Sequence, residues 1–117
     1  MSHLNSRRRV VIADISLVPI KKGKASMSDE IAVAFMAIEK TKGLRVTLTG
    51  MGTQVESPNL KAILDAVEAA HDAVKNVGVS RIISTVRIDQ RLDKMDTLED
   101  RVKAVTKKLN KRKLTSS

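Results

Sequence analysis

Stretches of alternating apolar and polar residues, interrupted twice by apolar residues at helical spacing, constrain the fold of this chain more than any other feature. The alternation is rich in β-branched residues and predicts strands at residues 10–20, 44–49, 53–56 and 79–89. Helical spacing predicts one helix between the first two strands and another between the last two. This order is that of the α+β ferredoxin-like βαββαβ fold, an antiparallel four-stranded sheet with helices on one face. Apolar residues spaced through 98–109 predict a further C-terminal helix.

Local signals predict where these elements begin and end. Proline has no backbone N–H, so Pro19 limits how far the first strand can pair. Short polar side chains can accept hydrogen bonds from the first N–H groups of a helix, and proline is tolerated in its first turn. The expected first-turn residues are Ser26 or Ser28, Ser57 with Pro58, and Thr97 with Asp100.

Size and composition describe one small domain with an aliphatic core. The chain has 117 residues, of which Phe35 is the sole aromatic, and we expect Phe35 on the helix face directed at the core. A domain of this size is marginal by surface-to-volume scaling, which favours self-association. The absence of cysteine excludes disulfides, thiolate nucleophiles and cysteine-based metal sites, and it fits a reducing compartment.

The net charge of +9 is concentrated at the two ends of the chain. Residues 1–9 hold three arginines and residues 107–117 hold five lysines and arginines, neither with an acidic residue, whereas residues 10–106 hold 14 basic and 13 acidic side chains. We therefore expect a nearly neutral domain at residues 10–109 between basic, flexible ends at 1–9 and 110–117. Solvated tails are favoured over a weak contact with a polyanion.

Apolar runs are too short for membrane insertion. A membrane helix needs about 18 or more apolar residues, and no run approaches that length. The arginines followed by residues 10–13 resemble a signal peptide, but Asp14 interrupts the apolar run and no cleavage pattern follows. The expectation is a cytoplasmic protein without membrane association.

Two polar stretches beside predicted strands are the candidate ligand-binding segments. Residues 50–56, Gly-Met-Gly-Thr-Gln-Val-Glu, place two glycines where the backbone can approach another strand or a ligand. Residues 87–94, Arg-Ile-Asp-Gln-Arg-Leu-Asp-Lys, alternate charges just past an apolar strand. The residues that we single out are Ser16, Met51, Gly52, Thr53, Glu56, Arg87 and Asp89.

Several short motifs follow one another along the chain, and in this order they are together fairly specific for one protein family. They are Ala13-Asp14-Ile15-Ser16-Leu17-Val18-Pro19-Ile20, Ser26-Met27-Ser28, Met51-Gly52-Thr53-Gln54-Val55-Glu56, His71, and Arg87-Ile88-Asp89 through Arg91, Asp93 and Lys94. With them the chain resembles the YkoF-like thiamine-binding proteins over residues 11–109. The resemblance implies a binding protein that is not an enzyme. With two histidines and no cysteine, the sequence predicts no metal site, and we expect no cofactor. The resemblance also implies thiamine or its hydroxymethylpyrimidine half as ligand, and sheets that pair in homodimers or homotetramers.

Each candidate residue also has an interpretation that needs no ligand. Glu56 can pair with an aminopyrimidine or offset a thiazolium, or can form an ordinary surface ion pair at a strand end. Ser16 can donate to a ligand or be satisfied across the sheet. The glycines can present backbone donors or serve a turn that needs positive φ. The other polar residues are a structural, hydrogen-bonded His71 and a solvated turn at Arg91, Asp93 and Lys94, which with Arg87 would suit a phosphorylated ligand.

Three other functions compete with small-ligand binding. RNA-recognition domains share the element order but stack bases on exposed aromatics, and the equivalent positions here, such as Ile12, Asp14 and Thr53, carry none, which disfavours nucleic acid. The sequence shows no nucleophile–base pair, metal cluster or phosphate loop of the kind that would indicate an enzyme. A structural or regulatory homo-oligomer without a small ligand is the remaining alternative. The scarcity of aromatics counts against thiamine, because flat rings are often held by stacking.

Overall fold

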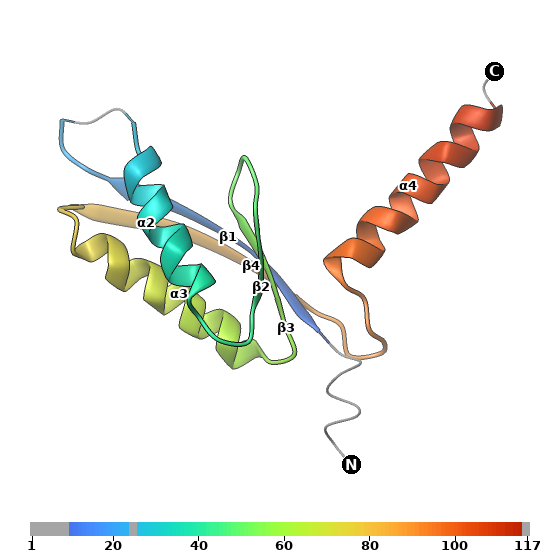
Figure 1. Cartoon of the computed structure of the whole chain (residues 1–117), viewed down its shortest axis with the longest axis horizontal. Helices are drawn as coiled ribbons and strands as arrows, with labels where there is room; N and C mark the ends of the chain where they lie inside the picture. The colour runs from blue at the N-terminus through green and yellow to red at the C-terminus, as the bar shows by residue number, and fades with distance from the viewer. Residues whose placement is uncertain (1–9, 24–25, 116–117) are drawn as a thin grey trace, which may run out of the picture.

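The computed structural model describes residues 10–23 and 26–115, so the basic segment expected at residues 1–9 lies outside the described residues. Its elements follow the predicted order and confirm the α+β ferredoxin-like arrangement with an added C-terminal helix (Figure 1). They are β1 (Val11–Ile20), α2 (Ser28–Glu39), β2 (Arg45–Leu48), β3 (Thr53–Ser57), α3 (Leu60–Lys75), β4 (Arg81–Gln90) and α4 (Leu98–Thr115).

The sheet is antiparallel, with the strand order β2-β3-β1-β4. Helices α2 and α3 cover one face of it (Figure 1). Alternate residues of β1 point toward these helices and form the core with aliphatic residues of α2, β3 and α3, as the composition predicts. The core residues are Val11, Ala13, Ile15, Ala34, Ile38, Val55, Ile63, Ala66, Ala70 and Val74.

The expected position of Phe35 is wrong. The ring is only half-buried and does not belong to the core cluster, because the smaller Ala34 and Ile38 occupy the face of α2 that packs on the sheet. Phe35 lies instead toward the edge of that face. This shift brings the sole aromatic ring of the chain to a cleft that is described below.

The opposite face of the sheet carries polar and apolar residues in cross-strand rows. Ile12 lies between Glu56 on β3 and Asp89 on β4, and Asp14 lies between Gln54 and Arg87. Further along β1, Ser16 pairs with Thr85 and Val18 with Ile83. Directly opposed residues point to the same face, so these rows confirm the predicted partition of β1 and β4 into two faces.

One edge of β1 is open over its second half. Strand β3 pairs with β1 only from Val11 to Ile15. On the other side, β4 pairs with β1 as far as Ile20, so the expectation that Pro19 ends the pairing is wrong for that side. Peptide groups alternate in direction along a strand, and the carbonyl of Ile20 accepts from Ser80 beside β4. The ring nitrogen of Pro19 therefore faces the open edge, where no strand needs a donor.

The helix starts differ in part from the expected caps. Asn59 caps α3, and its side chain accepts from the N–H of Ala62 at 2.9 Å. Ser57 belongs to β3, so the expected Ser57–Pro58 start is two residues early. The residue before α2 is Met27, which makes no side-chain capping bond. The expected start of α4 is confirmed, since Thr97 and Asp100 exchange side-chain to backbone hydrogen bonds at 3.0 and 3.1 Å.

Helix α4 extends away from the sheet as an arm (Figure 1). Its start is fastened to the body by the Leu98 N–H, which donates to the Glu56 carboxylate at 3.3 Å, and by Arg101, which donates to Asp89 at 2.7 Å. The helix continues to Thr115, past the domain end expected at residue 109. Its apolar stripe is exposed, at 65% for Val102, 58% for Val105 and 50% for Leu109.

Candidate ligand-binding cleft

A cleft of about 260 Å³ lies where the open edge of β1 meets α2 and the β2–β3 hairpin. Its volume is slightly below the range of about 300–1,000 Å³ typical of small-molecule sites, so it suits a ligand smaller than a drug. Four of the predicted site residues line it: Ser16, Met51, Gly52 and Thr53. The rest of its lining is mostly apolar and includes Ile31 and Phe35 of α2 and Leu48 of β2.

Phe35 and Met51 both contribute to the cleft wall, from different elements. Phe35 contributes from α2, and Met51 contributes from the tip of the β2–β3 hairpin, where it is 88% exposed. A thioether is polarisable and adapts its shape to aromatic surfaces. A phenyl ring and a methionine that line the same cleft both offer surfaces on which a flat heterocycle can pack.

The polar groups of the hairpin tip largely satisfy one another. The Thr49 hydroxyl donates to the Gly52 carbonyl at 2.7 Å and accepts from the Gly52 N–H at 3.1 Å. The Thr49 N–H also donates to the Gly52 carbonyl, at 2.9 Å. The N–H and C=O of Gly52 are therefore both used within the hairpin, which disfavours Gly52 as a direct backbone donor for a ligand.

The open edge of β1 supplies unpaired backbone groups to the cleft. A Cβ built on Gly52 would lie 2.8 Å from the Ile15 carbonyl oxygen, so that carbonyl points toward β3. Leu17 is two residues further on, and its N–H and C=O point the same way, beyond the end of the β1–β3 pairing. Leu17 lines the cleft, and its edge presents one donor beside one acceptor.

The two glycines of the hairpin have different roles. Gly52 approaches the backbone of β1 so closely that a side chain does not fit, which confirms the expected approach to another strand. Gly50 has no heavy atom within 4 Å of a built Cβ. Neither glycine has positive φ, so the alternative of a turn that requires this conformation is wrong.

A second, more polar cavity of about 590 Å³ lies on the open sheet face beside the start of α4. The predicted site residues Arg87 and Asp89 line it, together with Asp14, Gln54 and Arg101. Arg101 donates a hydrogen bond to the Asp89 carboxylate, which holds the pKa of Asp89 below its ordinary value of 3.8. Asp89 thus serves first as a partner of α4.

Glu56 also serves the arm in this structure. Its carboxylate is buried, with 8% of the residue exposed, and it accepts from the Leu98 N–H at the N-terminus of α4. A carboxylate at that position is favoured by the helix dipole and by the unpaired N–H groups there. The structure therefore separates the predicted residues into a cleft group, a group on the open face, and Glu56 under α4.

The two arginines considered for a phosphorylated ligand line different cavities, Arg87 the one on the open sheet face and Arg91 a second one just past the end of β4. Arg91 pairs with Asp93 at 2.7 Å and lies 3.5 Å from Asp96, as expected for a surface turn.

His71 is half-buried, and its Nε2 lies 2.8 Å from the Ser84 hydroxyl, which agrees with a hydrogen-bonded structural histidine. Within residues 10–23 and 26–115, no group of three or more His, Asp or Glu side chains is arranged to hold a metal ion.

Sequence reasoning missed two contributors to the cleft. Phe35 was assigned to the core, and the Leu17 backbone was not considered. The signal for Phe35 was its place one residue after Ala34, which a helix rotates by about 100° away from the core-facing position. The signal for Leu17 was the difference in length between the predicted strands, since a strand of about ten residues cannot be matched by one of four.

A family model described as thiamine-binding protein matches residues 13–106. This chain belongs to that family. Among curated relatives of this thiamine-binding family member, a UPF0045 protein of Methanothermobacter thermautotrophicus is 34% identical over 100 residues, which cover 86% of this chain and all of the relative.

Solved structures of similar proteins share the fold. A hypothetical protein of Methanocaldococcus jannaschii is 39% identical, with a TM-score of 0.75 over 84% of this chain and 97% of the other. A Thermotoga maritima protein provisionally assigned to thiamine biosynthesis or salvage is 19% identical, with a TM-score of 0.65 over 82% and 98% of the two chains. Over the described residues of this family member, no helix has the length and apolar character to cross a membrane.

Proposed function

We propose that this chain binds the aminopyrimidine part of thiamine, or free hydroxymethylpyrimidine, in the cleft between β1, α2 and the β2–β3 hairpin. The observation that carries the proposal is the meeting of the sole aromatic ring, Phe35, with the open edge of β1 in one cleft of about 260 Å³. The family description supports the ligand class. The proposed role is binding without catalysis.

The edge of Leu17 suits an aminopyrimidine because of its hydrogen-bonding pattern. A ring nitrogen accepts and the adjacent exocyclic amine donates, which complements a backbone N–H beside a C=O. Pairing of this kind adds the ligand to the sheet edge much as a short strand would be added. Stacking on Phe35 would compensate for the scarcity of aromatics elsewhere in the chain.

The uncharged lining of the cleft favours a neutral pyrimidine over a phosphate group. None of the described residues that line it is charged. A neutral pyrimidine meets no desolvation penalty from an unpaired charge there, whereas a phosphate would leave its partners Arg87, Arg91 and Lys94 outside the cleft. We therefore expect hydroxymethylpyrimidine and thiamine to bind, and thiamine phosphates to gain nothing from their added charge.

Calorimetry with Phe35→Leu and Glu56→Gln tests this placement. Loss of base–aromatic stacking costs about 1–3 kcal/mol, so Phe35→Leu should weaken hydroxymethylpyrimidine binding by roughly 5-fold to 150-fold. Met36→Leu is the matched control, because Met36 follows Phe35 on α2 but is 52% exposed outside the cleft lining. Glu56→Gln should leave the affinity nearly unchanged.

Two results would contradict the proposal. Binding that survives Phe35→Leu and is lost in Glu56→Gln would move the ligand to the cavity beside α4. No saturable binding at millimolar concentrations would remove the pyrimidine assignment and favour the alternative of a structural homo-oligomer. The exposed residues Ile83, Val102 and Val105 favour self-association to a homodimer or homotetramer in either case.

A further inference from the structure

Three polar residues on the open sheet face take no part in the cleft. Gln54, Asp14 and Arg87 lie in one row across β3, β1 and β4, because Asp14 is directly opposite both of the others. All three line the cavity of about 590 Å³ beside the start of α4, which we call the open-face cavity. Cavities of about 300–1,000 Å³ are typical of small-molecule sites. The row therefore lines a space large enough for a second ligand.

Asp14 and Arg87 do not pair with each other, although their strands place them side by side. Directly opposed residues of opposite charge usually attract each other across an antiparallel pair. Between these two described residues, however, there is no ion pair or hydrogen bond. One carboxylate oxygen of Asp14 lies 3.3 Å from a Cβ built on Gly52, on the β3 side of β1, whereas Arg87 is on the β4 side. The carboxylate thus leans away from the guanidinium, and the two charges line the open-face cavity separately.

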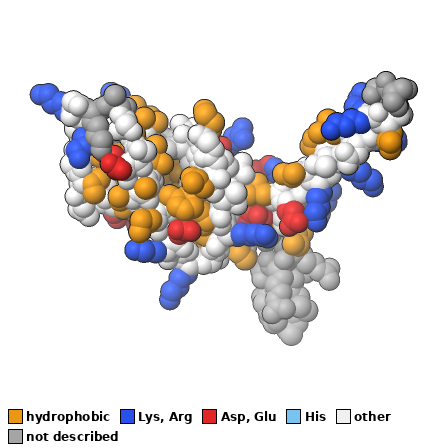
Figure 2. All heavy atoms as spheres, turned by 45° about the horizontal axis from the view of Figure 1, so that its top comes forward, with side chains coloured by type: hydrophobic (Ala, Val, Ile, Leu, Met, Phe, Trp, Pro, Cys, Tyr) orange, Lys and Arg blue, Asp and Glu red, His pale blue; other side chains and the backbone are white. Residues whose placement is uncertain are grey.

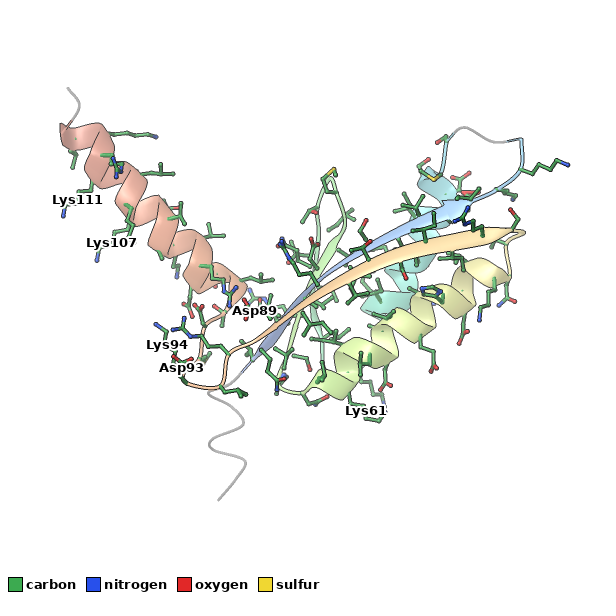
Figure 3. The ribbon with its side chains drawn as sticks, turned by 180° about the vertical axis from the view of Figure 1, so that it is seen from behind. Lys61, Asp89, Asp93, Lys94, Lys107 and Lys111 are labelled. Atoms are coloured by element: carbon green, nitrogen blue, oxygen red, sulfur yellow. The ribbon has the colours of Figure 1, made fainter. Side chains whose placement is uncertain are left out.

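The other two charged residues of the open-face cavity are paired with each other. Arg101 donates to the Asp89 carboxylate at 2.7 Å, and Figure 3 shows Asp89 where β4 leads to the base of α4. Side chains of both signs lie together where the arm leaves the body (Figure 2). Arg87 acts on Asp89 only as a nearby charge that helps to lower its pKa. Within the described part of the chain, the side chains of the Gln54–Asp14–Arg87 row have no hydrogen-bond or ion-pair partner.

Apolar residues line the part of the open-face cavity nearest to α4. Ile12 lies in the next cross-strand row, between Glu56 and Asp89, and only 6% of it is exposed. Leu98, the first residue of α4, is half-buried and lines the same cavity. A short aliphatic group placed beside these two residues would be removed from water without burying a polar group. The cavity therefore combines two separate, opposite charges with a small apolar region.

We propose that the open-face cavity binds a small zwitterion, a free α-amino acid with an aliphatic side chain such as leucine. The Arg87 guanidinium would donate to the ligand carboxylate, and the ligand ammonium would donate to the Asp14 carboxylate. A ligand with only a negative charge would place it beside Asp14, and one with only a positive charge would place it beside Arg87. A metal ion is disfavoured, because the described residues contain no group of three His, Asp or Glu side chains arranged to hold one.

This site is independent of the pyrimidine cleft. The two spaces share no lining residue, since the cleft begins at Ile15 on β1 and the open-face cavity ends at Asp14. The side chains of Asp14 and Arg87 also lie on the face of the sheet opposite to α2 and α3. The amino-acid proposal therefore goes beyond the function proposed above and does not depend on it.

Calorimetric titration of the full chain with L-leucine, and with two probes that each lack one charge, tests the proposal. Isocaproate is leucine without the ammonium, and isoamylamine is leucine without the carboxylate. Each should bind at least about tenfold more weakly than L-leucine, because one charged hydrogen bond is missing. Arg87→Gln and Asp14→Asn should weaken L-leucine binding by a similar factor. Arg87→Gln should not weaken isoamylamine further, since that probe has no carboxylate for the guanidinium to bind.

The matched control is Arg81→Gln, which removes the same charge from the same strand. Arg81 is exposed on β4 and is not part of the cavity lining, so this variant should bind L-leucine like the parent chain. Phe35→Leu, the cleft variant, should also leave L-leucine binding unchanged, which separates the two sites. Circular dichroism checks that the variants keep their fold.

Three results would overturn the proposal. Equal losses of affinity in Arg81→Gln and Arg87→Gln would show that net charge alone explains binding. Equal affinities for L-leucine and isocaproate would show that Asp14 does not contact an ammonium. No saturable binding of L-leucine at millimolar concentrations would mean that the charges of the row are simply solvated.

Discussion

Substitution of alanine for Gly52 should destabilise the protein, whereas the same substitution at Gly50 should not. The two glycines flank Met51 in one hairpin, and neither has positive φ, so backbone conformation does not distinguish them. A Cβ at position 52 would lie 2.8 Å from the Ile15 carbonyl oxygen and 3.3 Å from a carboxylate oxygen of Asp14. A Cβ at position 50 would meet nothing within 4 Å.

The expected magnitudes follow from these contacts. Ile15 belongs to the buried backbone of a central strand and cannot retreat, so the clash at position 52 should cost about 1–3 kcal/mol, as overpacking usually does. Alanine also restricts the unfolded chain, which contributes about 0.4–1 kcal/mol of stability at either site. The net expectation is a loss of about 1–2 kcal/mol for Gly52→Ala and a small gain for Gly50→Ala.

Urea unfolding followed by circular dichroism measures both variants against the parent chain. At roughly 3–5 °C per kcal/mol for a domain of this size, the melting temperatures of the two variants should also differ by several degrees. The dependence of unfolding free energy on urea should stay the same, because neither change alters the buried surface much. Equal stability of the two variants would refute the close approach of Gly52 to β1.

Two further predictions concern the helix starts. Asn59→Ala should lower the free energy of unfolding by about 1 kcal/mol through loss of the cap on α3, and Asn59→Asp should keep most of that stability. Urea unfolding measures both variants, and an alanine variant as stable as the parent chain would contradict the role of Asn59 as a cap. The pKa of Asp89, lowered by the Arg101 hydrogen bond, and that of Asp100, lowered by the Thr97 N–H, lie below their ordinary value of 3.8. The folded protein therefore holds these protons less tightly than the unfolded chain, so their stabilisation is complete above about pH 4 and is lost as the pH falls through the lowered values. Carboxyl NMR titration should show this, and release of α4 between pH 5 and 6 would contradict it.

The fold was predictable because two periodicities alternate along the chain without conflict. In residues 10–20 the polar Asp14 and Ser16 share one face, so the other face of β1, with its core residues Val11, Ala13 and Ile15, could be identified directly. The caps were less certain, because Ser57, Pro58 and Asn59 all favour a helix start and sequence preference cannot rank them. The paired geometry of β3 decides it, by extending the strand to Ser57.

The cleft was predictable only in part. Ser16, Met51, Gly52 and Thr53 stood out through their residue types and lie together around it. Glu56 stood out as well, but its position beneath α4 depends on where a helix forty residues later begins. Leu17 contributes backbone groups, which no side-chain motif reveals. Phe35 was misplaced because a helix with four apolar residues on one side does not show which of them the sheet covers.

Pro19 has a consequence for what can occupy the open edge of β1. An exposed strand edge is normally a template on which another chain can extend the sheet and so begin aggregation. Here the edge offers the donor and acceptor of Leu17, and two residues later the ring of Pro19 removes the next donor. A heterocycle that needs a single donor–acceptor pair finds it there, whereas an incoming β-strand loses its ladder after one residue. The protein can leave this edge uncovered and still resist edge-to-edge polymerisation.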